Sequence, residues 1–162
     1  MALFEEAEQD AEYERARKRA MYLLGSRPYS TAALREKLLN NYSEETADKV
    51  IEDMTRYGFL DDEDYARRLA SAIIKGKKYG LYRAKAEMRR KGVPDELIEQ
   101  ALSEYSREDM AESLTELVRK KYSERLYDRD ERQKVIAALA RRGYGFGEIK
   151  AAVMTVLEEI ND

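Results

Sequence analysis

Cationic side chains are the residues of this sequence whose type and spacing best suit chemistry with a partner. Between Arg67 and Lys91 there are ten basic residues and one acid, Glu87, although the whole chain has a net charge of −3. Helix dipoles favour cations at helix C-termini, which accounts for one or two bases per helix but not for this density. Such a stretch is typical of a face that binds phosphates or an acidic partner. The candidate contact residues are Arg67, Arg68, Lys77, Lys78, Tyr79, Arg83, Arg89, Arg90, Lys91, Arg119, Lys120, Arg141 and Arg142.

The twelve tyrosines allow two interpretations. Aromatic rings stack nucleobases in proteins that bind single strands. A tyrosine near a helix end also commonly packs its ring and leaves its hydroxyl in water, and we favour this interpretation for most of them. Tyr79, Tyr82 and Tyr122 lie among bases and are the better contact candidates.

The sequence offers little for catalysis. It contains no His and no Cys, so the common zinc and copper ligands and an ordinary catalytic triad are missing. Gly76-Lys77-Lys78 lacks the upstream glycine and the Ser or Thr of a phosphate-binding loop. Carboxylates at Asp61, Asp62 and Asp64 are possible Mg²⁺ ligands, but they suit the start of a helix better. We therefore expect no enzyme, no metal and no cofactor.

Composition also indicates where the protein works. Without cysteine there are no disulfides, which favours a reducing compartment. The apolar runs are only a few residues long, and the acidic start Met1–Glu6 lacks the apolar region of a secretory signal. We expect a cytoplasmic monomer that does not cross a membrane.

The cations are positioned by a threefold repeat. Arg90-Lys91-Gly92-Val93 and Arg141-Arg142-Gly143-Tyr144 read as the same helix end followed by a glycine turn, and Asn40-Asn41-Tyr42 is a shorter copy without glycine. Tyr42, Val93 and Tyr144 lie 51 residues apart. The apolar positions that follow each turn share one helical spacing; they are Ala47, Val50, Ile51 and Met54, then Ile98, Ala101, Leu102 and Tyr105, then Ile149, Ala152, Val153 and Val156. A repeat of this length indicates a helical array.

Each copy of the repeat contains three predicted helices. The first helices run from about Glu6 to Gly25, from Asp61 to Gly76 and through Met110 to Val118, and a polar connection is expected from Tyr122 to Asp130. Ser30, Ser43 and Pro94 suit helix starts, and Gly58 suits a helix end. We predict an all-α fold of three tandem three-helix repeats, at residues 1–60, 61–105 and 106–162, that share apolar surface in an elongated, curved array.

Several motifs together resemble the RecX family of regulators of the RecA recombinase. They are Arg27-Pro28-Tyr29-Ser30, Leu34-Arg35-Glu36-Lys37-Leu38, Tyr57-Gly58-Phe59-Leu60-Asp61-Asp62, Tyr65-Ala66-Arg67, Gly80, Arg83, Arg90-Lys91-Gly92-Val93, and Arg141-Arg142-Gly143-Tyr144 with Ile149. The resemblance extends from about Arg17 to Ile160, and the order of the motifs makes it specific.

The resemblance implies a non-enzymatic protein of tandem three-helix repeats. It implies binding to RecA, in the groove of its filament on DNA, and inhibition of its ATPase, recombinase and coprotease activities in DNA repair, homologous recombination and the SOS response. Two features depart from the family: Asn40-Asn41 stands where the family has Lys-Gly, which predicts weaker binding by the first unit, and the net charge is acidic. The alternative from the residues is a helical nucleic-acid-binding protein that acts independently of RecA, on single- or double-stranded DNA.

Overall fold

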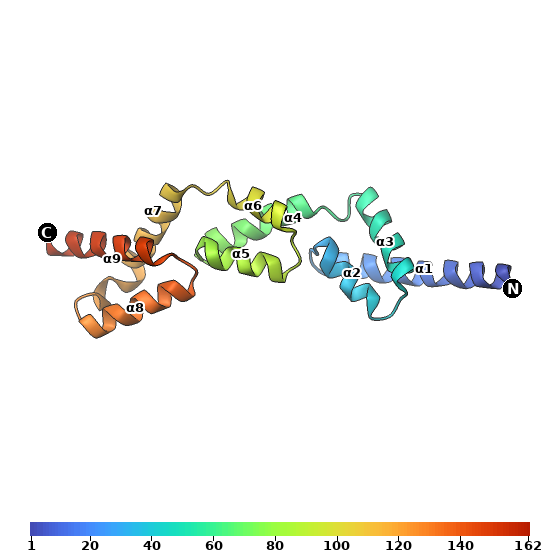
Figure 1. The fold of residues 1–162 in the computed structure, drawn as a ribbon, viewed down its shortest axis with the longest axis horizontal. Helices are drawn as coiled ribbons and strands as arrows, with labels where there is room; N and C mark the ends of the chain where they lie inside the picture. The colour runs from blue at the N-terminus through green and yellow to red at the C-terminus, as the bar shows by residue number, and fades with distance from the viewer.

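Nine α-helices and no strands make up the computed structural model, which describes residues 1–162. The helices are α1 (Ala2–Ser26), α2 (Thr31–Leu39), α3 (Glu44–Arg56), α4 (Asp62–Ser71), α5 (Leu81–Arg90), α6 (Asp95–Leu102), α7 (Arg107–Leu117), α8 (Arg129–Arg141) and α9 (Phe146–Asn161). They form three units in a row, which we call unit 1 (α1–α3), unit 2 (α4–α6) and unit 3 (α7–α9). The array is elongated, with the two termini at opposite ends (Figure 1). None of the nine helices has the length and apolarity needed to cross a membrane.

Helix caps explain where most helices begin and end. The hydroxyls of Ser30 and Ser43 accept hydrogen bonds from the backbone N–H groups of Ala33 and Thr46, as predicted. Gly58 ends α3 with a φ of 83°, also as predicted. The carboxylate of Asp61 accepts a bond from the N–H of Asp64, so this residue caps α4. The first helix begins at Ala2, earlier than the predicted Glu6.

The repeated apolar positions form the interior of each unit. Nine of the twelve side chains are buried, and the remaining three, Ile51, Leu102 and Tyr105, are partly buried. In the turns, Val93 and Tyr144 are buried and Tyr42 is partly buried. The helical spacing read from the sequence therefore predicted the inward faces correctly.

The first helices of units 2 and 3 end differently from that of unit 1. Each continues into a π-helical segment, Ala72–Gly76 and Val118–Tyr122. A 3₁₀ turn at Ser123–Arg125 then leads to Leu126, which is fully buried. The predicted polar connection from Tyr122 to Asp130 is thus partly wrong, and so is the interpretation of Tyr122 as a contact residue, because its ring packs in the core.

The buried side chains form two separate clusters. One cluster of 10 residues lies within unit 1, whereas a single cluster of 21 residues runs through units 2 and 3. Apolar packing therefore continues from unit 2 into unit 3, whereas unit 1 meets unit 2 through a more polar contact that is described below.

Candidate functional site: a basic groove between units 1 and 2

Two glycine turns hold the array together. Gly92 and Gly143 follow α5 and α8 with φ values of 87° and 97°, a conformation that favours glycine. Each turn packs against the start of the second helix in the preceding unit, as the loops after α5 and α8 show in Figure 1. A Cβ atom on Gly92 would lie 2.8 Å from the hydroxyl of Ser30, and one on Gly143 would lie 2.4 Å from the Cβ of Arg83. Glycine is needed at both turns because two units meet there.

The contact between units 2 and 3, which we call junction 2–3, is rich in hydrogen bonds. The backbone N–H groups of Gly80 and Tyr82 donate to the carbonyls of Arg142 and Gly143, at 2.8 and 3.2 Å. The hydroxyl of Tyr144 donates to the carbonyl of Lys78 at 2.8 Å. The guanidinium of Arg142 donates to the carbonyl of Lys77, and that of Arg83 to the carbonyl of Arg141.

The contact between units 1 and 2, junction 1–2, is sparser. The buried hydroxyl of Ser30 donates to the carbonyl of Lys91 at 2.6 Å. The backbone N–H of Thr31 donates to the carboxylate of Asp62 at 2.8 Å. The acidic cluster at the start of α4 therefore caps both its own helix and the neighbouring α2.

The same geometry explains why the first turn lacks glycine. Asn40 and Asn41 lie at the outer end of unit 1, where no preceding unit approaches. Asn40 has a φ of −65°, which any residue adopts. The weaker partner binding predicted for unit 1 on the basis of this departure stays a prediction.

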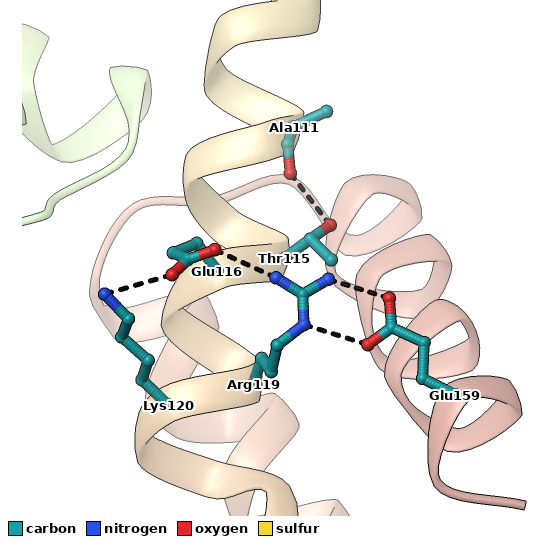
Figure 2. A network of polar contacts seen from close by, with 6 residues as sticks. All are labelled: Ala111, Thr115, Glu116, Arg119, Lys120 and Glu159. Atoms are coloured by element: carbon teal, nitrogen blue, oxygen red, sulfur yellow. Dashed lines mark hydrogen bonds and ion pairs between the residues drawn. The ribbon is translucent and has the colours of Figure 1, made fainter.

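Most of the predicted contact cations are held by carboxylates of their own unit. Arg67 and Arg68 bind Asp64, and Arg89 binds Asp95 at 2.9 Å, which lowers the pKa of the Asp95 carboxyl. The guanidinium of Arg119 donates to both carboxylate oxygens of Glu159, at 2.9 and 2.7 Å. Glu116 binds both Arg119 and Lys120, and Figure 2 shows all of these contacts. The pair of Arg119 with Glu159 ties the π-helical segment after α7 to α9, so Arg119 has a structural role within unit 3. Lys120 pairs only with Glu116 and remains exposed.

A second group of predicted cations surrounds one ring at junction 2–3. The guanidinium of Arg83 lies 3.9 Å from the centre of the Tyr79 ring, and Lys77 and Arg142 lie 5.7 and 5.9 Å from it. Glu87, only 8% exposed, pairs with Lys77 at 3.5 Å and with Arg83 at 3.4 Å. Of these residues, Arg83 and Arg142 also donate hydrogen bonds across junction 2–3, while Tyr82 is exposed beside them.

Several cations without an acidic partner lie together at junction 1–2. A groove with a volume of about 340 Å³ opens there and contains Arg27, Lys37, Arg90 and Lys91, none of which forms an ion pair. Glu36 is the only acid that lines it. The other lining residues are Pro28, Tyr29, Ala33, Asn40 and Tyr65.

Aromatic rings order the cations of this groove. The guanidinium of Arg27 stacks 4.2 Å from the centre of the Tyr29 ring, which is itself buried. Burial raises the pKa of Tyr65, partly offset by the positive charge of Arg27. This arrangement of unpaired cations beside two rings suits the binding of an oxyanion.

Sequence reasoning found only half of this site. Arg90 and Lys91 were predicted, whereas Arg27 and Lys37 were not, although both stand in the motifs that carry the family resemblance. The charge count missed them because they lie outside the basic stretch Arg67–Lys91 and reach it only through folding. The residues next to Arg27 and Lys37 in the sequence do not indicate that these two side chains lie near Arg90 and Lys91.

Comparison with known proteins identifies the family. Models of the first, second and third three-helix domains of RecX match residues 16–54, 61–102 and 108–153. The regulatory protein RecX of Trichlorobacter lovleyi is 40% identical over 132 residues, which cover 77% of this chain and 84% of that protein. The chain belongs to the RecX family. The RecX protein of Prosthecochloris aestuarii is 33% identical over 149 residues, covering 91% and 97% of the two chains.

Solved structures agree with this fold. The crystal structure of RecX from Lactobacillus salivarius superposes with a TM-score of 0.81 over 91% of this chain and 97% of the other, at 18% identity. At such low identity the likeness supports the fold alone. The all-α fold of three three-helix repeats and the RecX resemblance, both predicted from the sequence, are confirmed. As a member of this family, the chain is a regulatory protein.

Proposed function

We propose that this RecX chain inhibits the RecA recombinase without catalysing a reaction. It lies along the RecA–DNA filament and modulates its ATPase, recombinase and coprotease activities. The observation that carries the proposal is the rod of three similar units, two of which share one apolar core, with unpaired cations at junction 1–2. The unit boundaries after residues 60 and 105 belong to this proposal.

A rod with repeated units suits a helical polymer. A filament presents the same surface at regular intervals, so successive units can touch successive protomers. Linked weak contacts gain through effective concentration, provided that the spacing allows them to engage together. Bridging adjacent protomers restricts changes in their relative orientation, on which nucleotide turnover depends.

The direct test is RecA ATPase activity on single-stranded DNA with the RecX chain added below stoichiometry. We expect inhibition at ratios well below one chain per RecA protomer. An unchanged ATPase rate at one RecX chain per RecA protomer would contradict the proposal. Tight, steeply salt-dependent binding to DNA in that same material would instead favour the RecA-independent alternative.

The groove can be tested in the same assay. Replacing Arg90 and Lys91 with Glu should weaken inhibition, because both are unpaired cations. Arg129→Glu with Lys150→Glu is the matched control, since both are exposed and unpaired in unit 3 and the charge change is equal. Circular dichroism should show unchanged helicity in both variants. Equal inhibition by the two variants would remove the groove from the site but leave the family assignment intact.

A further inference from the structure

Helix α1 is divided by charge into two halves. Residues 1–14 contain six acids and no base, whereas residues 15–26 contain four bases and no acid. Like charges three or four positions apart on a helix repel each other, so each half is destabilised by its own charges. The one ion pair of α1 joins Arg17 to Glu14, across the boundary between the halves. Most of the charges on α1 therefore form no ion pair within the chain.

The first part of α1 is also left uncovered by the rest of the chain. All residues from 1 to 11 are exposed, and the buried residues of α1, which are Ala16, Ala20 and Leu23, lie in its second half. Leu3 and Phe4 are 80% and 81% exposed. A helical stretch of fewer than about 12 residues is marginal in water unless it packs against another element. We therefore expect a surface outside this chain to cover this part of the helix.

One face of α1, which we call the outer face, is exposed along the whole helix. It consists of Phe4, Glu8, Ala11, Arg15, Lys18 and Tyr22. These residues follow one another at spacings of three and four positions, the spacing at which two helices pack side by side. The hydroxyl of Tyr13 donates to the carboxylate of Asp53 in α3, so the opposite side of α1 is turned toward unit 1. The outer face is thus free to meet another helix.

We propose that the outer faces of two chains pack against each other as an antiparallel pair of helices, so that the protein forms a homodimer. The outer face is symmetric about position 13 of the sequence. Phe4 therefore lies opposite the partner's Tyr22, and Glu8 lies opposite the partner's Lys18. The twofold axis of the pair repeats each of these contacts at its other end.

Charge complementarity identifies a second copy as the partner. In an antiparallel pair the acidic half of each α1 lies along the basic half of the other, and the two attract. A parallel pair would instead place Glu8 beside Glu8 and Lys18 beside Lys18. A basic helix from another protein would neutralise the acidic half but leave Arg15 and Lys18 without an acid. A second α1 in reverse orientation matches both halves.

The pairing also determines the shape and strength of the dimer. Helix α1 runs along the long axis of the array, with the N-terminus at one end (Figure 1). Two antiparallel α1 helices therefore join the chains at their first units and direct their third units to opposite ends. One helix pair is a small interface, so we expect a weak dimer, and the monomer expected from the sequence is then the state at low concentration. The proposal goes beyond RecA inhibition, because it concerns this chain alone.

Sedimentation equilibrium of the full chain, without RecA or DNA, measures the association. We expect a reversible equilibrium between monomer and dimer that shifts toward monomer at high salt, because exposed ion pairs are screened. Phe4→Ala should weaken the association roughly tenfold, since an aromatic contact is lost at both ends of the pair. Because Phe4 is 81% exposed in the single chain, this substitution should leave the thermal unfolding of the monomer unchanged.

Charge reversal tests the pairing itself. Glu8→Lys and Lys18→Glu should each weaken self-association roughly tenfold or more, because attraction becomes repulsion at two symmetric places. Mixed in equal amounts, the two variants should form a heterodimer about as readily as the parent forms its homodimer, since each position 8 then meets an opposite charge at position 18. Glu99→Lys and Lys150→Glu make the same charge changes at exposed positions of α6 and α9 and should leave the association unchanged.

The orientation of the two helices needs a distance measurement. The chain has no cysteine, so a spin label can be attached at Ala2→Cys, an exposed position. In the antiparallel dimer the two labels lie about 22 positions apart along the pair, which is roughly 33 Å at 1.5 Å per residue. A parallel pair would bring the labels within about two helix diameters of each other, or roughly 20 Å.

Three outcomes would overturn the antiparallel dimer. A chain that stays monomeric at every concentration would mean that the outer face does not bind a second copy; if a lysine-rich amphipathic helical peptide then bound through Phe4, the face would belong to another protein. Equal weakening by Glu8→Lys and Glu99→Lys would mean that association follows net charge. Labels at the shorter distance would mean parallel helices. Because no RecA is present, none of these results bears on RecA inhibition.

Discussion

The two junctions have similar turn geometry and opposite charge chemistry. In both, a glycine turn packs against the N-terminus of the preceding unit's second helix. Lys37 is the seventh residue of α2 and Glu87 the seventh of α5, so these two residues take equivalent places. At junction 2–3 the acid pairs with Lys77 and Arg83, and the guanidinium of Arg83 also donates across the junction to the carbonyl of Arg141. At junction 1–2 the residue in this place is a base, which lies with Arg27, Arg90 and Lys91 in the groove. The charge at this one position therefore differs between the two junctions.

The largest effect should come from closing the space at the turn of junction 2–3. Gly143→Ala places a Cβ atom 2.4 Å from the backbone N and the Cβ of Arg83, in a residue with a φ of 97°. The left-handed backbone costs about 1–2 kcal/mol and the overpacking about 1–3 kcal/mol, so we expect the free energy of unfolding to fall by about 2–5 kcal/mol. Urea denaturation followed by circular dichroism measures this loss.

Gly58→Ala is the control for backbone strain. Gly58 has a φ of 83°, but a Cβ atom there would meet nothing within 4 Å. This variant should lose only about 1–2 kcal/mol. An equal loss in both variants would show that the close approach at junction 2–3 contributes nothing to stability.

The sequence predicted the parts of the fold that depend on local patterns, and it missed the contacts between distant residues. The apolar spacing after each turn placed nine buried residues correctly, because helical periodicity is a local property. The glycine at 92 and 143 was recognised as a helix end, but its second role, the approach to Ser30 and Arg83, involves residues about 60 positions away. No local pattern contains that contact.

The candidate site was predicted in part for the same reason. Counting charges identified Arg90 and Lys91, yet it could not tell them from Arg119, whose partner Glu159 is 40 residues distant. The charge count also missed Arg27 and Lys37, because these residues reach the groove only through the packing of unit 1 on unit 2. Pairing across the fold, rather than density along the chain, decides which cations are unpaired.

The second prediction concerns the hydroxyl that spans junction 1–2. Ser30→Ala removes the cap of α2 and also the bond to the carbonyl of Lys91, and the Ser30 side chain is fully buried. We expect a loss of about 2 kcal/mol, of which the cap contributes about 1 and the bond between the units about 1. Ser106→Ala removes a cap that makes no contact between units and should cost about 1 kcal/mol. Losses of the same size would mean that the bond to Lys91 does not stabilise junction 1–2.

The third prediction removes one hydrogen bond from junction 2–3. Tyr144→Phe deletes the bond to the carbonyl of Lys78 and should cost about 1 kcal/mol at neutral pH. Tyr82→Phe alters an exposed ring and should cost nothing measurable. Thermal unfolding at fixed ionic strength compares the two variants.

The same tyrosine makes junction 2–3 sensitive to alkali. Burial raises the pKa of Tyr144 above its ordinary value, because the ionised ring would be poorly solvated. Its stabilising contribution is therefore complete below pH 10 and is lost as the pH rises through the raised value. Above pH 10, the gap in stability between the chain and the Tyr144→Phe variant should shrink. A gap that stays constant up to pH 12 would contradict this account.

The smallest effect on stability should come from replacing Lys37 of junction 1–2 with an acid, the charge that Glu87 carries at the equivalent place of junction 2–3. Lys37→Glu places an acid among Arg27, Arg90 and Lys91, where exposed pairs contribute roughly 0–1 kcal/mol. The free energy of unfolding should stay within about 0.5 kcal/mol of the parent or rise slightly, and any rise should vanish at high salt because exposed pairs are screened. Lys150→Glu, an equal change on the exposed face of α9, controls for net charge. If the groove is a binding surface, this substitution should abolish its anion affinity while leaving the fold unchanged. A loss above 1 kcal/mol in the free energy of unfolding would instead mean that Lys37 stabilises junction 1–2. Lys37 would then have a structural role, as Glu87 has at junction 2–3.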